Sequence, residues 1–367
     1  MADDQVIVGL DIGTTTVSAV IAEYNDEGEL EIIGLGTAPS RGLRRGVVIN
    51  IEATLRSVAA AVEAAEQVAG REVSSVITGI AGGHIEGLNS RGVVAVTGRG
   101  REITREDVDR VIDAAKAVVI PMDREVLHVI PQEFIVDEQG GIKNPLDMIG
   151  VRLEAEVHII TGSVTSAQNL VKCVNRAGFK VSDIVLESLA SSRAVLTSDE
   201  KELGTMLIDL GGGTTDILIY RDGAPYYTSV LPLGGSQVTS DLSIMLKTPT
   251  DAAELIKQEA GCCYASLVEP GEPVIIPGVG GRPPMSIDRM GICEIVQARV
   301  AEILSMVREK IEPKGYLPHL GAGIVLTGGG ALMPGVVELA QEIFGTAARI
   351  GQPGNLGTNK KTVIETV

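Results

Sequence analysis

The chain has 367 residues, enough for two or more domains with buried cores, and 44% of them are hydrophobic, as in a globular protein. Its formal net charge of −17 argues against bulk nucleic-acid binding, because no basic stripe displaces phosphate counterions. Aromatic residues make up only 2%, so aliphatic cores are expected. Since no signal-peptide pattern and no apolar membrane-spanning run is found, a cytoplasmic location is expected.

The first predicted elements are three strands joined by short turns. The sequence "VIVGLDIGTTT" (6–16) is a β-rich run that ends in Asp11 and a Gly/Thr turn, and the strand-like runs 17–24 and 30–38 follow. A helix is predicted next, with Asn50 as its N-cap and Gly70 as its stop.

A second copy of this pattern begins 198 residues later, counted from Asp11 to Asp209 (209 − 11). In "IDLGGGTTDILIY" (208–220) an apolar run again ends in an acid and a turn of Gly and Thr. Further strands follow, and then a helix that begins after Gly234 and Gly235. Strands that alternate with helices in both copies predict an α/β fold with one sheet in each half.

The two turns have a chemical use. Glycines allow close approach and let several backbone N–H groups converge on one anion, and threonine hydroxyls add donors. A carboxylate at the end of the strand suits hydrated Mg²⁺. One such turn is often only a hairpin corner, but two that face each other would hold a polyphosphate. A third glycine cluster, "TGGGALMPG" (327–335), would let a flat ring lie on bare backbone, or is an ordinary strand-to-helix turn.

The segment between the two predicted strands near 75–80 and 157–162 has a pattern of its own. It contains strands and a helix that begins at Thr104, with Asp107 in a capping box, so we expect a small inserted domain and not a loop. His158 is expected to be a structural histidine, and the adjacent Cys262 and Cys263 are expected to be small buried side chains without a redox or metal role.

Several enzyme motifs are absent. The sequence has no "GK" dipeptide and hence no Walker A loop, no G-x-G-x-x-G between a strand and a helix, and no G-x-S-x-G elbow.

Three strings carry a resemblance to a known family: "IPQEFIVDEQGGIKNPLDMIGVRLEAEVHIITG" (130–162), "LASSRAVLTSDEKELGTMLIDLGGGTTDI" (189–217) and "IPGVGGRPPMSI" (276–287). With the repeated turns, they resemble the FtsA family of bacterial cell-division proteins in the actin/Hsp70/hexokinase superfamily, over about 6–353. The resemblance implies an α/β fold of two actin-like (ribonuclease H-like) halves around a nucleotide cleft. The implied domains are a first core (1A, residues 1–83 and 163–203), an inserted FtsA-specific subdomain (1C, 84–162), a second core (2A, 204–235 and 311–367) and a smaller lobe (2B, 236–310).

The resemblance also implies a site for ATP or ADP with Mg²⁺. Mg²⁺ would be held through water by Asp11 and Asp209. The first phosphate loop would consist of Asp11, Gly13, Thr14, Thr15 and Thr16, and the second of Gly211, Gly212, Gly213, Thr214 and Thr215. Gly234 and Gly235 would begin the helix that follows the second loop, and Glu254 and Lys257 would hold the ribose and adenine. The adenine would lie against Gly328, Gly329 and Gly330.

Catalysis is expected to be slow ATP hydrolysis at most, because "DIGTTTV" offers no lysine to the phosphates. Asp209 and Glu187 are the candidate catalytic residues, and Glu187 either orients a water molecule or is structural. The Glu254–Lys257 pair has its own alternative, an exposed ion pair on a helix.

The partners implied by the family are a second copy of the chain in a head-to-tail filament, the C-terminal tail of FtsZ near Arg299, and other division proteins at the inserted subdomain. Arg299 is otherwise part of a solvated helix face. The implied location is cytoplasmic, at the inner face of the cell membrane at midcell. The last residues, "GNLGTNKKTVIETV", have no apolar stripe, so membrane binding is expected only if an amphipathic C-terminal helix is added.

Two other functions use the same fold. A small-molecule kinase would need a carboxylate base beside a pocket for its second substrate, and the sequence shows no such pocket. An Hsp70-like chaperone motor would need a peptide-binding domain, for which this chain is too short.

Overall fold

The computed structural model describes residues 6–25, 27–269, 271–354 and 357–358. The prediction about the end of the chain falls largely on residues 359–367, which lie outside the described residues. Within the described part, no helix is both long and apolar enough to cross a lipid bilayer.

The first half contains a six-stranded sheet in the order β11-β6-β1-β2-β3-β19. Its elements are β1 (Ile7–Ile12), β2 (Thr16–Tyr24), β3 (Leu30–Pro39), β4 (Leu43–Arg44), β5 (Val47–Val48), α1 (Ile51–Ala69), β6 (Ser75–Ile80), α3 (Val164–Arg176), β11 (Lys180–Leu186), α4 (Glu187–Val195), α5 (Ser198–Leu203) and β19 (Gly357–Thr358). The strands β1, β2 and β3 form the predicted antiparallel meander, and β6 and β11 add to it in parallel.

Helix α1 covers one face of this sheet and begins and ends where the sequence predicts. The Asn50 side chain accepts a hydrogen bond from the backbone N–H of Ala53, and Gly70 ends the helix with a left-handed φ of 66°. Gly36 on β3 is needed for this packing, because a Cβ atom there would lie 2.2 Å from the carbonyl oxygen of Ala61. Val8, Leu10 and Ile12, alternate residues of β1, share the apolar core with α1, so the intervening Asp11 lies on the opposite face of the sheet.

The second half repeats this order as β14-β13-β12-β17-β18. Its elements are β12 (Thr205–Leu210), β13 (Thr215–Arg221), β14 (Ala224–Leu231), η3 (Glu312–Lys314), η4 (Leu317–His319), β17 (Ile324–Thr327), η5 (Gly329–Leu332), α9 (Val336–Phe344) and β18 (Ala348–Ile350). An antiparallel meander is again extended by parallel strands. The duplication predicted from the two similar turns is thus present in the topology.

The chain end departs from the predicted ranges at one point. Residues 357–358 pair in parallel with β3 in the sheet of the first half, whereas the predicted range 311–367 places them in the second half. A short strand pair after the second sheet has no turn signal or apolar pattern that the sequence could reveal.

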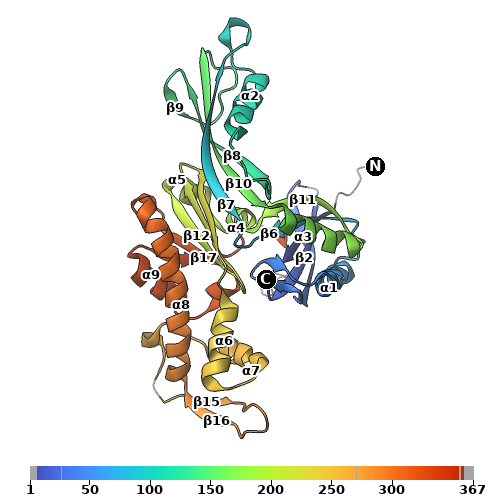
Figure 1. The fold of residues 1–367 in the computed structure, drawn as a ribbon, viewed down its shortest axis with the longest axis vertical. Coiled ribbons are helices and arrows are strands. Elements are labelled where there is room, and N and C mark those ends of the chain that lie inside the picture. Colours follow the sequence, from blue (N-terminus) through green and yellow to red (C-terminus); the bar gives the residue numbers. More distant parts are fainter. Residues whose placement is uncertain (1–5, 26, 270, 355–356, 359–367) are drawn as a thin grey trace.

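A smaller lobe extends from the second half, at the bottom of Figure 1. It consists of α6 (Gly235–Leu246), α7 (Thr250–Ala260), η2 (Ala265–Leu267), β15 (Pro273–Ile276), β16 (Met285–Asp288) and α8 (Arg289–Ile311). The long helix α8 runs from the β15–β16 hairpin up to the second half, and its buried side chains join the core there. The lobe and the second half therefore share one continuous apolar core.

The inserted segment forms an antiparallel sheet in the order β7-β10-β8-β9 with one helix packed on it. Its elements are β7 (Glu86–Ala95), η1 (Arg99–Arg101), α2 (Arg105–Lys116), β8 (Arg124–Val136), β9 (Gln139–Ile142) and β10 (Arg152–Ser163). It has its own apolar core, and its far end projects away from the two halves in both views of the fold. The expectation of an inserted small domain, in place of a loop, is confirmed.

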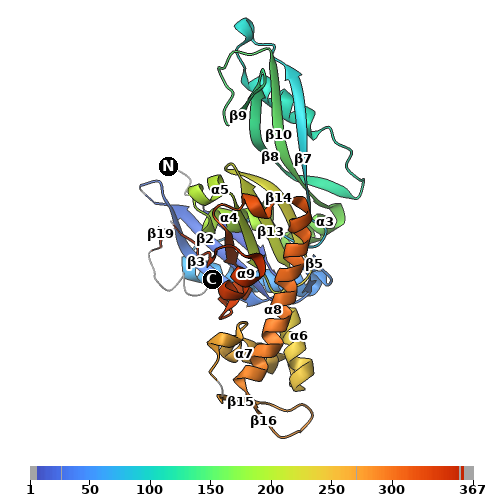
Figure 2. The same cartoon turned by 90° about the vertical axis from the view of Figure 1, so that its left-hand side faces the viewer.

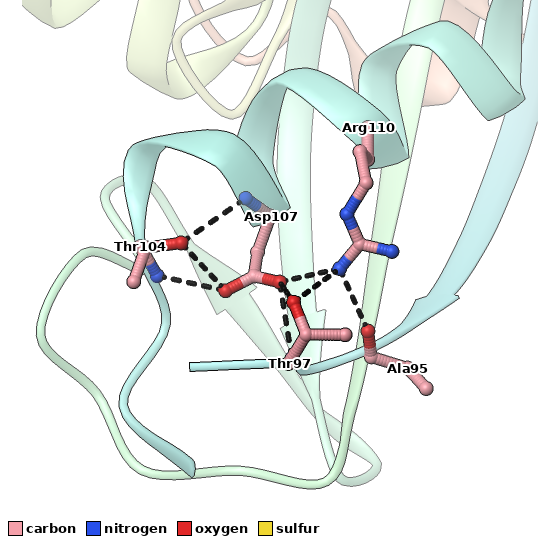
Figure 3. A network of polar contacts seen from close by, with 5 residues as sticks. All are labelled: Ala95, Thr97, Thr104, Asp107 and Arg110. Carbon is pink, nitrogen blue, oxygen red and sulfur yellow. Dashed lines mark hydrogen bonds and ion pairs between the residues drawn. The ribbon is translucent and has the colours of Figure 1, made fainter. Parts of the chain in front are cut away.

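The start of α2 is fixed by the predicted capping box around Asp107 (Figure 3). The fully buried Asp107 carboxylate accepts hydrogen bonds from the backbone and hydroxyl of Thr104 and of Thr97, and pairs with Arg110. Arg110 also donates to the carbonyl oxygen of Ala95, 2.9 Å away. Burial raises the pKa of Asp107, but the hydrogen bonds from Thr104 and Arg110 outweigh it and hold the pKa well below its usual range. Asp107 thus joins α2 to the end of β7.

We expect Asp107→Ala to destabilise the insert by about 3 kcal/mol, because it removes a helix cap and one partner of a buried ion pair. Hydrogen exchange of α2 and β7 should speed up, while α1 in the first half is unaffected. The matched control is Asp113→Ala on the exposed side of α2, whose ion pair with Lys116 lies at the surface. Equal exchange rates in the two variants would contradict the role given to Asp107.

Candidate functional site

Two glycine- and threonine-rich loops lie against one another between the two halves. A Cβ atom on Gly212 would lie 2.6 Å from the Thr15 side chain, and one on Gly213 would lie 2.5 Å from the Thr14 side chain. Each loop follows the acid-bearing strand of its own half, β1 or β12. The structure therefore brings together the two turns that the sequence places 198 residues apart (209 − 11).

Both loops are held by backbone contacts with their surroundings. In the first, a Cβ on Gly13 would lie 2.8 Å from the carbonyl oxygen of Thr16, so this turn is tight. In the second, the carbonyl oxygen of Gly211 accepts a hydrogen bond of 2.9 Å from the N–H of Gly235, at the start of α6. Gly234 is packed so closely against the same loop that a Cβ would come 2.3 Å from the Gly211 oxygen. The glycines at the helix start fix the second loop to the smaller lobe.

Four carboxyl groups gather where the loops meet, on Asp11, Glu187, Asp209 and Asp216. Asp209 accepts a hydrogen bond of 2.7 Å from the hydroxyl of Ser191 on α4. Glu187, the first residue of α4, lies within hydrogen-bond reach of Asp11 in the same half. Asp216 is opposite Asp209 in the β12–β13 register, and its Oδ1 atom is buried without a hydrogen-bond partner in the described part of the chain. Asp11 and Asp209, assigned to one site from the sequence, thus do lie together.

The negative charges of these four carboxyl groups repel one another. Burial, and then the neighbouring Asp209, raises the pKa of Asp216 to about 8. Burial, and then the charges of Asp11, Asp216 and Asp209, raise the pKa of Glu187 well above its usual range. Burial also raises the pKa of Asp209 against the effect of Ser191.

Asp11 differs from the other three acids because its side chain is exposed to solvent, even though protein surrounds it. Enclosure by the protein raises the pKa of Asp11 most, and the charge of Asp209 raises it further. Water around the exposed Asp11 carboxylate screens part of both effects. An exposed carboxylate beside the half-buried Glu187 and Asp209 and the buried Asp216 suits a hydrated cation that enters from the gap between the halves.

Sequence reasoning missed Asp216 as a member of this cluster. A signal was present, since "TTDILIY" places a charged residue at the start of a strand that is otherwise apolar, whereas the equivalent residue of the first copy, opposite Asp11, is Ser18. Among the described residues, no group of three or more His, Cys, Asp and Glu side chains is arranged to ligate a metal directly.

A second polar group lies beside the loops, where α6 and α7 meet. The Lys257 ammonium contacts the Glu254 carboxylate at 2.8 Å and the Thr239 hydroxyl at 3.0 Å. It also reaches the carbonyl oxygen of Gly235 at 3.4 Å, next to the second loop. The predicted Glu254–Lys257 pair is therefore half-buried and not a freely solvated ion pair. Lys257 lies close enough to the second loop to touch a ligand held there.

The third glycine cluster borders the acid group from the other side. Gly328 has a left-handed φ of 81°, and a Cβ there would lie 2.3 Å from Oδ1 of Asp209. Gly330 packs on Leu210, while Gly329 has open space around its Cα. Pro334 precedes Gly335, the N-cap of α9, as the sequence indicates. All three glycines thus lie beside the second loop, and only Gly329 is free of close contacts.

Arg299 lies away from this site, in a groove of about 610 Å³ on the smaller lobe between α6 and α8. The groove has an apolar floor that includes Met245 and Ile295. The Asp241 carboxylate accepts hydrogen bonds from Nε and Nη2 of Arg299, at 2.5 and 3.1 Å. The remaining guanidinium nitrogen, Nη1, forms an ion pair with Glu302. Arg299 is thus part of a half-buried ion-pair network and not of a solvated helix face.

The other reactive residues lie in buried surroundings. His158 is 1% exposed and bonds Asn89 and Thr228, and burial lowers its pKa to about 4. The free cysteines are all buried, Cys262 and Cys263 among them.

Comparison with known proteins gives the family. A family model described as "SHS2 domain inserted in FTSA" matches residues 82–161, and one described as "Cell division protein FtsA" matches residues 206–365. The cell division protein FtsA of Borreliella burgdorferi is 54% identical over 348 residues, which is 95% of this chain and 84% of that protein. The chain belongs to the FtsA family.

Solved structures of the same fold are more distant in sequence. The type IV pilus biogenesis complex PilM–PilN matches with a TM-score of 0.67 at 15% identity, covering 98% of this chain and 94% of that one. MreB5 of Spiroplasma citri bound to ADP matches with 0.58 at 15% identity (95% and 92%), and the MamK double helical filament with 0.54 at 14% (95% and 95%). The FtsA-family chain therefore has the actin-like fold of two α/β halves, with the insert of its family.

Proposed function

We propose that this FtsA-family cell-division protein binds ATP or ADP with Mg²⁺ between its two halves. The observation that carries the proposal is the contact between the two Gly/Thr loops, one from each half, beside the carboxyl cluster. The backbone N–H groups and hydroxyls of Thr14–Thr16 and Gly211–Thr215 would hold the phosphates. Asp11 and Asp209 would hold Mg²⁺ through water. The unpartnered Oδ1 of Asp216 supports a cation at this place, since a buried carboxyl group without a partner is costly.

The same proposal assigns the residues around the loops. Glu254 and Lys257 would contact the ribose and adenine, and Gly328–Gly330 would lie against the adenine. Mg²⁺ would neutralise the phosphate charge, and Glu187 would orient the attacking water. Slow hydrolysis is expected because the first loop offers no lysine to the phosphates. A nucleotide held by both halves would fix the angle between them.

Binding of a fluorescent ATP analogue, followed by anisotropy with and without Mg²⁺, tests the nucleotide site. We expect saturable binding that is lost on chelation of Mg²⁺ and restored when Mg²⁺ is added back. An absence of binding at millimolar nucleotide would refute the site. The small-molecule kinase has no observation in its favour, and rapid phosphoryl transfer to a small alcohol would be needed to revive it.

We further propose that the protein self-assembles head to tail and collects FtsZ tails at the cytoplasmic face of the membrane at midcell. Identical heterologous contacts generate filaments, and the MamK neighbour of the same fold was solved as one. Many weak tail sites along a filament would act together. The insert would bind other division proteins. Electron microscopy with ATP, with and without tail peptide, tests assembly.

We expect Arg299→Ala to weaken binding of an FtsZ tail peptide by about 10-fold, equal to about 1.4 kcal/mol. The effect is moderate because Arg299 already pairs with Asp241 and Glu302, and an acidic tail must share or displace these partners. Anisotropy of a labelled peptide measures it, with Glu309→Ala on the exposed side of the same helix as the control. Unchanged binding in the Arg299 variant would exclude this groove as the tail site.

A further inference from the structure

The insert belongs to the first half by chain connection but contacts the second half. It leaves the first half after β6 and returns to it at α3. At its base, however, strands β7 and β8 lie along β14, the outer strand of the second sheet (Figure 2). An outer strand has one row of backbone groups without strand partners, and these must be satisfied in another way.

Side chains of the insert satisfy carbonyl groups at the start of β14. The Asn89 side chain on β7 donates to the carbonyl oxygen of Tyr226 at 3.1 Å. The Gln132 side chain on β8 donates to the carbonyl oxygen of Pro225 at 2.9 Å and to the Asn89 side chain at 3.3 Å. Gln132 is buried, so these contacts are shielded from water. Lys143 on the same side of the insert donates to another second-half backbone oxygen, just before β14.

His158 on β10 completes the network with both of its ring nitrogens. Its Nδ1 lies 2.6 Å from the Asn89 oxygen and its Nε2 lies 2.9 Å from the hydroxyl of Thr228 on β14. Gly87 leaves room for this contact, because a Cβ there would lie 2.7 Å from the His158 ring and 3.1 Å from Thr228. The network formed by Asn89, Gln132, His158 and Thr228 is called the base clamp below.

The base clamp fixes one position of the insert on the second half. A shift along β14 would leave buried amide, imidazole and hydroxyl groups unpaired, and each costs about 1–3 kcal/mol. A purely apolar contact could slide at much lower cost. Buried polar networks of this kind therefore have discrete arrangements and resist gradual displacement.

The connections to the first half are different in kind. The chain enters the insert through Gly82, with a φ of 129°, and Gly83, and it returns at the Ser163 cap of α3. Facing the first half, His128 accepts a hydrogen bond of 3.0 Å from the backbone N–H of Leu186. Two chain crossings with a glycine pair in one of them form a natural hinge.

We propose that the insert is held to the second half by the base clamp and moves with it as one rigid body, turning at the hinge when the two halves change their angle. The long strands β8 and β10 carry this movement from the clamp to the far end of the insert. The distal surface of the insert therefore reports the state of the distant cleft. The inference rests on the proposed function in one respect: the nucleotide is the ligand that is proposed to change the angle between the halves.

Spin-label distances in the full chain test the proposal. The natural cysteines are buried, so labels can be placed at three exposed positions: Gln139→Cys on the insert, Glu338→Cys on α9 of the second half and Glu63→Cys on α1 of the first half. When ATP and Mg²⁺ are added, we expect the 139–338 distance to stay constant. The 63–338 and 63–139 distances should both shift. A shift of 139–338 with a constant 63–139, or no shift at all in protein shown to bind nucleotide, would overturn the proposal.

A clamp variant tests the mechanism without nucleotide. Asn89→Ala combined with Gln132→Ala should broaden the 139–338 distribution, while Val93→Ala, exposed on the same strand β7, should leave it sharp. An unchanged distribution in the double variant would show that the base clamp does not hold the insert. This arm remains decisive even if the protein binds no ATP, an outcome that would refute the proposed nucleotide site instead.

Discussion

Asp209→Asn is expected to weaken Mg²⁺-dependent ATP binding at least 100-fold, about 2.7 kcal/mol, and to raise the unfolding temperature of the nucleotide-free protein. Binding weakens because one of the two carboxylates proposed to hold hydrated Mg²⁺ loses its charge. Stability rises because Asp209 repels Asp11, Glu187 and Asp216, whose pKa values are all raised by it. Opposite effects on ligand binding and on stability are typical of residues retained for function.

The gain in stability should depend on pH. An acid whose pKa is higher in the folded than in the unfolded protein binds more protons when folded, so stability falls as pH rises between the two values. For Asp216 this window runs from 3.8 to about 8. The stabilisation by Asp209→Asn should therefore be larger at pH 8 than at pH 5.

Thermal unfolding at both pH values and titration with a fluorescent ATP analogue provide the measurements. Glu63→Gln, which neutralises an exposed acid on α1, is the control and should change neither quantity. If Asp209→Asn destabilised the nucleotide-free protein, or bound Mg·ATP as tightly as the parent, the carboxyl cluster would not be a cation site.

Gly328→Ala is expected to cost at least about 2 kcal/mol of folding stability and to remove nucleotide binding. The φ of 81° at Gly328 is unfavourable for any residue with a side chain, and the new methyl group would lie 2.3 Å from Oδ1 of Asp209. The carbonyl group of Leu210, whose atoms would lie 2.8 and 3.0 Å from the methyl group, belongs to the backbone and cannot move aside as a side chain can. Asp209 would be pushed from its position in the cluster.

Gly329→Ala is a closely matched control, because the adjacent glycine has no atom within 4 Å of the position of a Cβ. We expect its stability to stay close to that of the parent in chemical denaturation. Its nucleotide affinity then tests whether the adenine lies on this backbone, since an added methyl group would meet the ring. Equal losses of stability in the two variants would contradict the steric argument for Gly328.

Local patterns were sufficient to predict the duplicated halves and the ends of several helices. The acid, glycine and threonine residues recur in order, so the two loops could be identified without any long-range information. Asn50, Gly70 and Thr104 were predicted as caps because capping depends on residues within one turn of the helix. The family resemblance then gave the order of the domains.

The contacts that were missed are long-range. Asp216 joins the acid cluster only because β13 pairs with β12, and the Arg299–Asp241 pair joins α8 to α6 across 58 positions. The base clamp likewise joins Asn89 and His158 to β14, and the residues of its His158–Thr228 contact are 70 positions apart in sequence. Side-chain partners of this kind depend on how separate elements pack, and no periodicity in the chain records them.

A structure of the protein with a non-hydrolysable ATP analogue and Mg²⁺ would test the central claim most directly. We predict one triphosphate in contact with both Thr14–Thr16 and Gly211–Thr215, with hydrated Mg²⁺ between the carboxyl groups of Asp11 and Asp209. A nucleotide bound by only one of the two loops, or at another surface of the molecule, would contradict it.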